Sequence, residues 1–341
     1  MVNEEVKEIE KVAPKFTGLI DLAAERLGGK ALYVTDDFFA EKENLLKPGR
    51  GIFIAGKFTD RGKWMDGWES RRKRTPGHDW CVIKLASSGI MKGFDIDTNF
   101  FLGNHPPHAM VEAALINDDS KITDWDKEVN WINVLEKSDL DAGSHNYFEC
   151  HDNNIFTHVR LNIFPDGGVA RFRVFGTVSK QWDLVGDDEN IDLAFALNGG
   201  KAIACNDMFF SSMDNLIMPG KGINMGDGWE TKRNRKPGNF DWVILRLGTT
   251  GIISNVLLDT EHFKGNYPDS FSLECCFTTN DKDVIDGKVE WETLIAGEKL
   301  SAHSEHKYNI DRQICASHVR LKIFPDGGVS RLRLVGKKFK C

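Results

Sequence analysis

The stretch between His158 and Gly176 reads HVRLNIFPDGGVARFRVFG, and the stretch between His318 and Gly336 reads HVRLKIFPDGGVSRLRLVG. Fourteen of the nineteen aligned positions are identical, at an offset of 160 residues. Self-similarity on this scale indicates an internal duplication. We therefore expect two copies of one domain in tandem.

The duplication continues upstream of this stretch. The segment DGWESRR at residues 66–72 recurs as DGWETKR at 227–233. The segment DTNFFLGNHP at 97–106 recurs as DTEHFKGNYP at 259–268. Because the order of the motifs is the same in both halves, the repeat covers most of each half.

The two copies differ in length at one place. Their offset changes between Gly51 and Asp66, so the first copy holds a loop of about ten extra residues, roughly 52–63. Helical periodicity with early acidic residues at 3–12 also predicts a short leading helix. The expected division is a leading segment at 1–27, a first domain at 28–176, a connector at 177–198 and a second domain at 199–341.

Composition limits the classes to which the protein can belong. The 341 residues are 41% hydrophobic and 28% charged, as in a folded, soluble protein, and the net charge of −7 argues against broad nucleic-acid binding. No apolar run approaches the roughly 20 residues that span a bilayer, and no signal-peptide pattern is present. The seven cysteines form no CxxC pair, which is typical of free thiols in a reducing compartment. We therefore expect a cytoplasmic protein without nucleic-acid or membrane partners.

Strand signals are clearest in the repeated stretch. Polar and apolar residues alternate strictly over 158–163 and again over 171–174, as in half-buried strands. Residues 165–168 between them contain Asp-Gly, which favours a tight turn. A two-residue turn there predicts a hairpin in which Arg160 lies opposite Arg173.

Short strands separated by Gly- and Asp-rich turns recur along both copies. Val82–Leu85 and Val243–Leu247 are short apolar runs of the kind that form buried strands. This pattern is typical of an antiparallel sandwich. We therefore expect an all-β chain of two tandem antiparallel jelly-roll sandwich domains.

The DGWE segment and the arginines after it carry the densest polar chemistry of each copy. Two carboxylates and two cations can bind a small polar ligand. Alternatively, the Asp caps a turn, the Trp packs and the Glu pairs with an Arg. The candidate residues are Asp66, Glu69, Arg72 and Arg74 in the first copy, and Asp227, Glu230, Arg233 and Arg235 in the second.

An Asp-Trp pair follows each arginine segment, beginning at Asp79 and Asp241, and is typical of a structural strand start. His78 precedes the first pair, and its counterpart in the second copy is Asn239. Asparagine can replace histidine as a hydrogen-bonding group but not as an acid–base catalyst. If only the first copy is active, His78 and Asp79 are candidate catalytic residues.

The DT…GN segment adds amide and carboxylate groups. Asp97 and Asn104 have the hydrogen-bonding groups that bind urea-like amides, although an Asx-type turn would use the same residues. His105 and His108 occur only in the first copy and add acid–base potential. Together with Asp97 they are also a candidate divalent-metal site, so a metal cofactor stays an open alternative.

The repeated stretch also carries a cationic face. His158, Arg160, Arg171 and Arg173 have basic counterparts in the second copy. Guanidinium groups bind carboxylates through two parallel hydrogen bonds, so this face is a candidate site for an organic acid. A row of arginines on a strand is more often solvated or salt-bridged.

Taken in order, the repeated motifs resemble those of allantoicase (allantoate amidinohydrolase). The shared frame is GGKA…D.FF…DGWE…PG..DW…DT..F.GN.P…HVRL.IFPDGGV, and it covers nearly the whole chain in both copies. The resemblance implies two jelly-roll domains related to galactose-binding-like modules. It also implies hydrolysis of allantoate to ureidoglycolate and urea, in purine (allantoin) degradation and nitrogen utilisation.

Allantoate is a carboxylate whose central carbon carries two ureido groups. Its site needs a cation, acceptors for urea N–H groups, an acid, and a base or metal that activates water. A non-catalytic tandem jelly roll that binds carbohydrate or another small ligand is the alternative, and exposed sheet edges favour a homo-oligomer. The catalytic candidates are Glu69, His78, Asp79 and His105, and the further substrate-binding candidates are Asp66, Arg72, Arg74, Asp97, Asn104 and Arg160, with Asp227, Glu230, Arg233 and Arg235 in the second copy.

Overall fold

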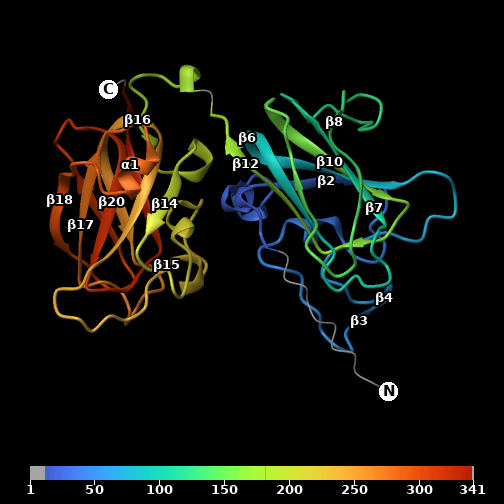
Figure 1. The fold of residues 1–341 in the computed structure, drawn as a ribbon, viewed down its shortest axis with the longest axis horizontal. Helices are drawn as coiled ribbons and strands as arrows, with labels where there is room; N and C mark the ends of the chain where they lie inside the picture. Colours follow the sequence, from blue (N-terminus) through green and yellow to red (C-terminus); the bar gives the residue numbers. More distant parts are fainter. Residues whose placement is uncertain (1–11, 181, 340–341) are drawn as a thin grey trace. The chain divides into compact units, whose positions relative to one another are not determined.

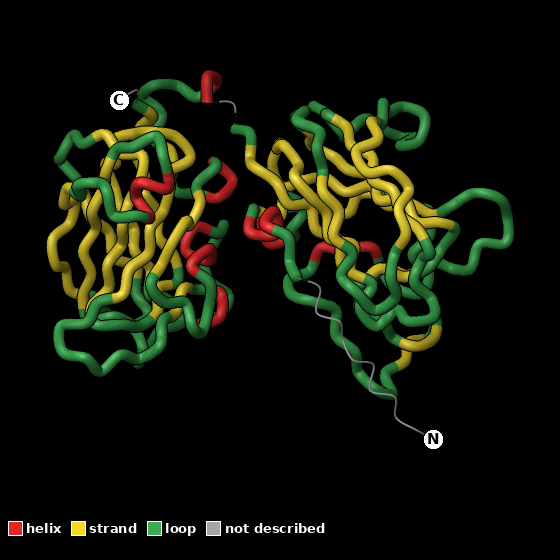
Figure 2. The backbone as a smooth tube through the Cα atoms, in the orientation of Figure 1, coloured by secondary structure: helices red, strands yellow, loops and turns green. Residues whose placement is uncertain are grey.

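The computed structural model describes residues 12–180 and 182–339. Within them the chain consists almost wholly of antiparallel strands (Figure 1, Figure 2), which confirms the all-β class. It divides into two compact units, Met1–Ser179 and Lys180–Cys341. Apart from its last residue, the predicted leading helix lies outside the described residues.

The first unit folds mainly into one antiparallel sheet. Its strands are β1 (Ile20–Asp21), β2 (Lys30–Val34), β3 (Phe58–Thr59), β4 (Gly62–Lys63), β5 (Trp68–Glu69), β6 (Asp79–Asp97), β7 (His108–Ala114), β8 (Ile132–Asp139), β9 (Tyr147–Glu149), β10 (Phe156–Phe164), β11 (Gly168–Val169) and β12 (Arg171–Val178). Its 3₁₀-helices are η1 (Lys15–Gly18), η2 (Glu25–Leu27) and η3 (Lys42–Leu46). The sheet order is β1-β12-β6-β10-β7-β8, with β2 and β9 also paired to β6.

Strand β6 belongs to both layers of the sandwich. Its first half pairs with β10 and β2, and its second half pairs with β12 and β9. Gly89 lies at the turning point, because it pairs with both Phe156 and Val178. A Cβ atom at Gly89 would lie 2.7 Å from Leu22 Cδ1 and 2.7 Å from the Thr177 carbonyl oxygen. This close approach requires glycine.

Because β6 turns at its middle, both of its ends reach the same end of the sandwich. Asp79 at its start pairs with Ile163, and Asp97 at its finish pairs with Arg171. Residues 165–168 lead from β10 into β11 between these two points. We call this region, marked by Asp79, Asp97 and residues 165–168, the motif end of the unit.

The apolar faces of the two layers meet in one core. Ile83 and Leu161 from one layer, and Phe94 and Phe172 from the other, are fully buried in the same hydrophobic cluster. Trp68 joins this cluster next to the motif end. The apolar residues of the alternating stretches therefore face inward, as the alternation predicted.

The predicted hairpin is wrong in its pairing. Strands β10 and β12 do not pair with each other, because Arg160 lies opposite Val82 and Glu112, whereas Arg173 lies opposite Asp95. The turn between them carries the chain from one layer to the other, and β11 directly after it pairs with β5. Alternation located both strands, but it does not distinguish a hairpin from an arch between layers.

The second unit repeats this architecture. Its strands are β13 (Ile191–Asp192), β14 (Lys201–Cys205), β15 (Trp229–Glu230), β16 (Asp241–Asp259), β17 (Ser270–Cys276), β18 (Glu292–Lys299), β19 (Glu305–Asn309), β20 (Cys315–Phe324), β21 (Gly328–Val329) and β22 (Arg331–Lys338). Its helices are η4 (Trp182–Leu184), η5 (Ala196–Asn198), η6 (Met213–Ile217), η7 (Met225–Asp227) and α1 (Asp281–Ile285). The sheet order β13-β22-β16-β20-β17-β18 matches that of the first unit strand for strand.

The extra loop of the first copy forms a small hairpin from β3 and β4. Arg61 Nη1 donates a hydrogen bond to the Phe38 carbonyl at 3.1 Å. Lys57 Nζ lies 3.7 Å from the centre of the Trp64 ring, at cation–π distance. The hairpin therefore lies against Phe38, and the described residues of the second unit form no equivalent hairpin.

Most of the described cysteines are free thiols, but Cys315 is disulfide-bonded, so the prediction of free thiols fails at that position. Burial raises the pKa of the Cys81 thiol far above its ordinary value, which makes it unreactive. Among the described residues, no helix has the length and apolar character needed to cross a membrane. The free cysteines are Cys81, Cys150, Cys205, Cys275 and Cys276.

The packing of the turn beside β5 can be tested with one added methyl group. A Cβ atom at Gly168 would lie 2.0 Å from the Phe101 ring, so Gly168→Ala must displace that ring. We expect the free energy of unfolding to fall by about 1–3 kcal/mol. Gly103→Ala is the matched control, because nothing lies within 4 Å of its added Cβ. Urea denaturation would measure both, and equal transition midpoints for the two variants would contradict this packing.

Candidate active site

The motif end of the first unit joins segments that are far apart in the sequence. The Gly168 N–H donates to the Asn104 carbonyl at 2.8 Å. The Lys73 N–H donates to Asp166 Oδ2 at 2.8 Å. The turn after β10 therefore fixes both the loop that follows β5 and the loop that follows β6.

A carboxylate–amide pair lies at this end of each unit. Asn104 Nδ2 donates to Glu69 Oε1 at 2.7 Å, and Asn266 Nδ2 donates to Glu230 Oε1 at 2.6 Å. Glu69 follows the buried Trp68 in β5. Because side chains alternate across a strand, burial of the tryptophan directs the glutamate away from the core.

The environment of Glu69 favours the protonated form of its carboxyl group. Burial raises the pKa of Glu69 above its ordinary value, and the hydrogen bond from Asn104 opposes this only in part. Among the described residues, no lysine or arginine forms an ion pair with it. A carboxyl group that keeps its proton closer to neutral pH can donate it as a general acid.

Three arginines follow Glu69 on an exposed loop, and the first of them, Arg71, pairs with Asp36. Arg72 and Arg74 are exposed, and neither has a hydrogen-bond or ion-pair partner among the described residues. They line a hollow of about 570 Å³ together with Asp36 and Phe39. Asp36 holds the loop, because its Oδ1 accepts from the Arg71 N–H at 2.9 Å. The loop backbone is thus fixed while two guanidinium groups remain available to a carboxylate.

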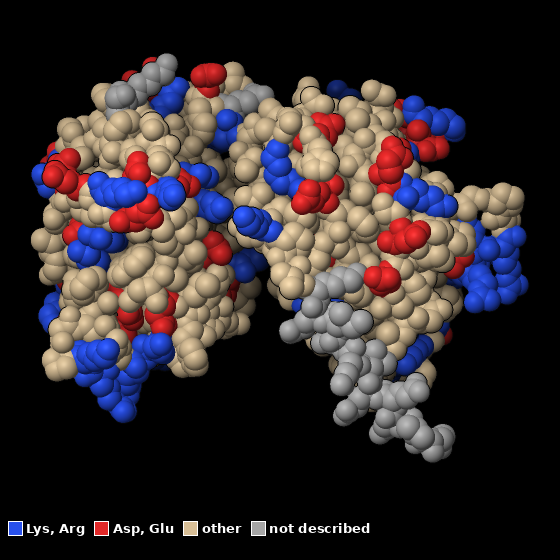
Figure 3. Space-filling view, viewed as in Figure 1, with Lys and Arg blue, Asp and Glu red and all other residues tan. Residues whose placement is uncertain are grey.

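The hollow adjoins the glutamate, because the Phe39 N–H donates to the Glu69 carbonyl at 3.2 Å. In the second unit Arg233 and Arg235 are likewise exposed, without partners in the described part of the chain. Figure 3 shows Lys and Arg side chains gathered at a protruding loop of each unit. A cationic loop beside a carboxylate–amide pair is therefore common to both units.

The two predicted catalytic histidines lie at the motif end of the first unit. His78 Nε2 lies 3.0 Å from Asn162 Oδ1, and its ring lies on Phe164 with the ring centres 4.3 Å apart. His105 directly follows Asn104, and its buried Nδ1 has no hydrogen-bond partner in the described structure. His105 is therefore not committed to the framework through that atom.

Asp66 is engaged in the framework rather than open to a ligand. Its Oδ2 accepts from Arg171 Nη2 at 2.7 Å in a buried ion pair, and Asp227 repeats this contact with Arg331 at 2.7 Å. Burial alone would raise the pKa of Asp66, but hydrogen bonds from Arg171 and the Ile52 N–H lower it below its ordinary value.

Asp79 and Asp97 are also buried and paired. Lys73 Nζ lies 2.6 Å from Asp79 Oδ1, and Thr35 Oγ1 donates to the same oxygen at 2.8 Å. Arg50 Nε lies 2.9 Å from Asp97 Oδ2. These carboxylates hold the loops around the ends of β6 in place.

The candidate metal ligands are not brought together. His108 Nδ1 lies 2.8 Å from Asp139 Oδ1, whereas Asp97 is paired with Arg50. Across residues 12–180 and 182–339, no group of three or more His, Cys, Asp or Glu side chains is arranged to hold a metal ion.

Arg160 belongs to a stacked cluster on the sheet rather than to the arginine loop. Its guanidinium pairs with Glu112 at 2.7 Å and with Asp126 at 2.8 Å. It also lies over the Trp80 and Trp131 rings, 5.3 Å and 5.0 Å from their centres. Its charge is therefore already satisfied.

Two aspartates that fix the arginine loop, Asp36 and Asp166, were not among the predicted site residues. A signal for Asp36 was present, because the pattern Asp-x-Phe-Phe recurs at Asp207 in the second copy. Asp166 lies in the repeated turn and was interpreted only as a turn residue. Asp326 repeats its role, accepting from the Asn234 N–H at 2.7 Å.

An Asp–His pair of the first unit was also not predicted. His145 Nδ1 lies 2.7 Å from Asp95 Oδ2, and its ring stacks on Tyr147 at 5.3 Å. The hydrogen bond to Asp95 raises the pKa of His145 above its ordinary value. Leu257 and Glu305 occupy the equivalent positions of the second unit. Because the pair is not duplicated, the repeat gave no signal for it.

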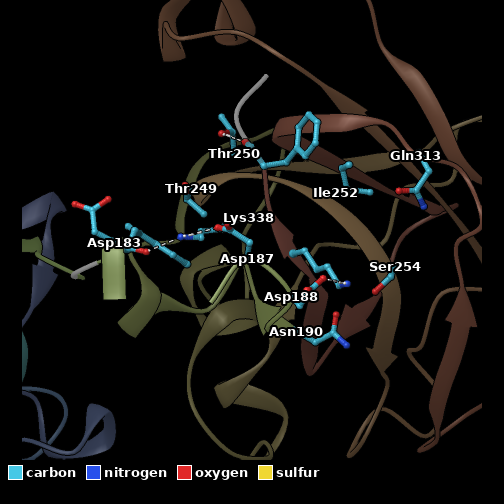
Figure 4. A pocket seen from close by; sticks show the side chains of 13 residues that line it. Asp183, Asp187, Asp188, Asn190, Thr249, Thr250, Ile252, Ser254, Gln313 and Lys338 are labelled. Atoms are coloured by element: carbon cyan, nitrogen blue, oxygen red, sulfur yellow. Dashed lines mark hydrogen bonds and ion pairs between the residues drawn. The ribbon is translucent and has the colours of Figure 1, made fainter. Parts of the chain in front are cut away.

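A cavity of about 1140 Å³ lies elsewhere in the second unit, near the middle of β16 (Figure 4). Strand β16 turns at Gly251, as β6 turns at Gly89, because Gly251 pairs with both Ala316 and Lys338. This turn lies at the opposite end of the strand's two halves from the motif end, so the cavity is remote from Glu230. Its lysines are paired, with Lys338 3.1 Å from Asp187 and Lys337 2.8 Å from Asp188. It lacks a carboxylate–amide pair, and we do not assign the active site to it.

Comparison with known proteins gives the same family over the whole chain. A family model described as an allantoicase repeat matches residues 20–179 and again residues 191–339. A probable allantoicase of Pseudomonas fluorescens Pf-5 is 50% identical over 331 residues, covering 95% of this chain and 98% of the relative. A probable allantoicase of Burkholderia mallei is 46% identical over 329 residues, covering 95% and 96%.

Solved structures agree with the sequence comparison. The crystal structure of allantoicase from Saccharomyces cerevisiae is 37% identical, covers 93% of this chain and 92% of that one, and superposes with a TM-score of 0.79. A second allantoicase structure is 36% identical, covers 94% and 93%, and gives a TM-score of 0.80. Fold and sequence match over nearly the full length of each protein. The chain belongs to the allantoicase family.

Proposed function

We propose that this chain is an allantoicase, a hydrolase that converts allantoate and water to ureidoglycolate and urea. The reaction breaks one C–N bond between the central carbon and a ureido group. The observation that carries the proposal is the half-buried Glu69, held by Asn104, next to a loop on which Arg72 and Arg74 have no partner in the described structure. Membership of the allantoicase family supports it.

Substrate binding uses the arginine loop and the amide. Arg72 and Arg74 bind the carboxylate of allantoate, because guanidinium groups bind carboxylates through paired, charge-assisted hydrogen bonds. The Asn104 amide nitrogen already holds Glu69, which leaves its carbonyl oxygen to accept from a ureido N–H. The substrate is thereby oriented with a ureido group toward Glu69.

Two proton transfers complete the reaction. Glu69 donates its proton to the nitrogen of the departing urea as the C–N bond breaks. His105 accepts a proton from the water that adds to the central carbon, so that a hydroxyl group replaces the ureido group. His78, whose ring is held by Asn162, gives the motif end of the first unit a second imidazole.

The other predicted residues have framework roles in this proposal. Asp66, Asp79 and Asp97 fix the loops through buried ion pairs, and Arg160 fixes the sheet surface. In the second unit Asp227 has the same framework role, while Glu230, Arg233 and Arg235 form a second polar site.

The reaction suits a cytoplasmic protein of purine degradation that releases nitrogen as urea. We include in the proposal a homo-oligomer that associates through exposed sheet edges, such as the largely exposed β8. Family membership favours hydrolysis over the alternative of a non-catalytic protein that binds carbohydrate or another small ligand.

The central test is Glu69→Gln, which keeps the shape and the contact with Asn104 but removes the titratable proton. We expect urea release from allantoate to fall by about 10³-fold, within the range that one general acid contributes. Glu136→Gln, the same exchange at an exposed position of β8, is the control and should retain wild-type turnover. Circular dichroism would establish that both variants fold.

Two outcomes would count against this function. If folded wild-type protein releases no urea from allantoate, with or without added divalent ions, the proposed allantoicase activity is wrong. Wild-type turnover in Glu69→Gln would remove this glutamate from the reaction. Repeating the assay after chelation decides the role of metal, because activity that is lost and then restored by a divalent ion would require one.

The pH dependence of turnover tests the role of Asn104. A general acid must be protonated, so turnover falls as pH rises through the pKa of Glu69. The Asn104 N–H stabilises the ionised carboxylate, and Asn104→Ala removes this stabilisation. We expect the alkaline limb of the kcat profile to move to higher pH. A limb that stays in place, or moves to lower pH, would contradict the assignment.

A further inference from the structure

The second unit repeats the groups that bind substrate at the first motif end. Glu230 accepts from Asn266 Nδ2 at 2.6 Å, as Glu69 does from Asn104 at 2.7 Å. The alignment of the two carboxylate–amide pairs is therefore kept in the tertiary structure as well as in the sequence.

The loop after Glu230 is also fixed in the same way. Asp207 Oδ1 accepts from the Lys232 N–H at 2.9 Å, and Asp326 Oδ2 accepts from the Asn234 N–H at 2.7 Å. These are the counterparts of Asp36 and Asp166 in the first unit. These bonds hold the backbone of the loop. The side chains of Arg233 and Arg235 are exposed and unpaired in the described structure, and they remain available to an anion.

The second unit lacks the imidazoles of the first. Asn239 replaces His78, and its amide is taken up by the framework, donating to the Pro325 carbonyl at 2.7 Å and accepting from Asn234 Nδ2 at 2.8 Å. Tyr267 replaces His105. Neither an amide nor a phenol supplies the ring nitrogen with which a neutral imidazole accepts a proton. The second motif end therefore has cations and acceptors but no imidazole at the two positions that carry His78 and His105 in the first unit. His262, in the same loop as Asn266, is bound into the framework, with its Nε2 2.8 Å from the Gly222 carbonyl oxygen.

We propose that the motif end of the second unit, built from Glu230, Asn266, Arg233 and Arg235, is a separate site that binds allantoate, or another ureido carboxylate, without hydrolysing it. The inference rests on the proposed function, because it assigns all turnover to the first unit. Binding needs only complementary charge and hydrogen bonds, whereas hydrolysis also needs a base that takes a proton from water.

The rival arrangement is two equivalent active sites, and Glu69→Gln separates the two arrangements. If both units hydrolysed allantoate, this variant would keep about half of the wild-type kcat, because the second site is intact. We expect instead a loss of about 10³-fold, as for removal of the sole general acid. Retention of about half of the turnover would overturn the inference and leave the allantoicase function standing.

Binding is measured in the same Glu69→Gln background by equilibrium dialysis against allantoate, with urea assayed at the end to confirm that little substrate has been consumed. We expect two equivalents bound per chain. Adding Arg233→Ala and Arg235→Ala should reduce this to one, and adding Arg72→Ala and Arg74→Ala instead should also leave one. One equivalent in Glu69→Gln that the Arg233 and Arg235 changes do not alter would show that the second site does not bind.

Converting the first site to the second tests the cause of the difference. His78→Asn with His105→Tyr gives the first unit the residues of the second. We expect turnover to fall at least about 10²-fold, the lower bound for a lost general base, while two equivalents of allantoate still bind. Turnover within a few-fold of wild type would overturn the claim that the imidazoles separate the two sites. Absence of urea release from the wild-type protein would instead signal failure of the proposed function.

Discussion

The turn of one long strand around a glycine is the constraint on which both units depend. At Gly89 an added Cβ would meet Leu22 and the Thr177 carbonyl at 2.7 Å, and at Gly251 it would meet the Lys337 carbonyl at 2.5 Å. Because the strand folds back there, its first and last residues arrive at one end of the sandwich. Loops separated by tens of residues then meet, and the polar motifs form one surface instead of several.

The DGWE motif shows how structural and chemical requirements share four residues. Asp66 pairs with Arg171, Gly67 leaves room for the Val169 carbonyl, which an added Cβ would approach to 2.5 Å, and Trp68 is in the core. Glu69 alone points outward to Asn104. The structural interpretation from sequence is confirmed for the packing of Trp68 but is wrong for Glu69, which pairs with Asn104 and not with an arginine. Ligand binding by Glu69 stays a prediction. Asp66, Gly67 and Trp68 thus fix the backbone, and Glu69 is the residue whose side chain they direct away from the core.

The duplication and the strand positions could be read from the sequence because repetition and alternation are local signals. Glu69 and Asn104 were predicted as separate candidates, and only the fold shows that they are hydrogen-bonded to each other. The pairing of strands β10 and β12 could not, since a chain that crosses between layers has the same local pattern as a hairpin. Asp79 and Asp97 look like ligands in sequence, but their lysine and arginine partners are contributed by the fold. The Asp95–His145 pair bridges fifty residues in one copy only.

Covalent duplication has a consequence for how the two ends can change. In a symmetric dimer of a single repeat, every substitution would appear in both subunits. Here each half is encoded separately, so among the described residues the hairpin of β3 and β4 and the Asp95–His145 pair occur in the first half alone, and His78 and His105 have no histidine at the equivalent positions of the second. One chain can therefore keep the same framework twice while the side chains at its two motif ends differ. The two units of the tandem chain can therefore differ from each other, and their covalent link keeps one of each kind in every molecule.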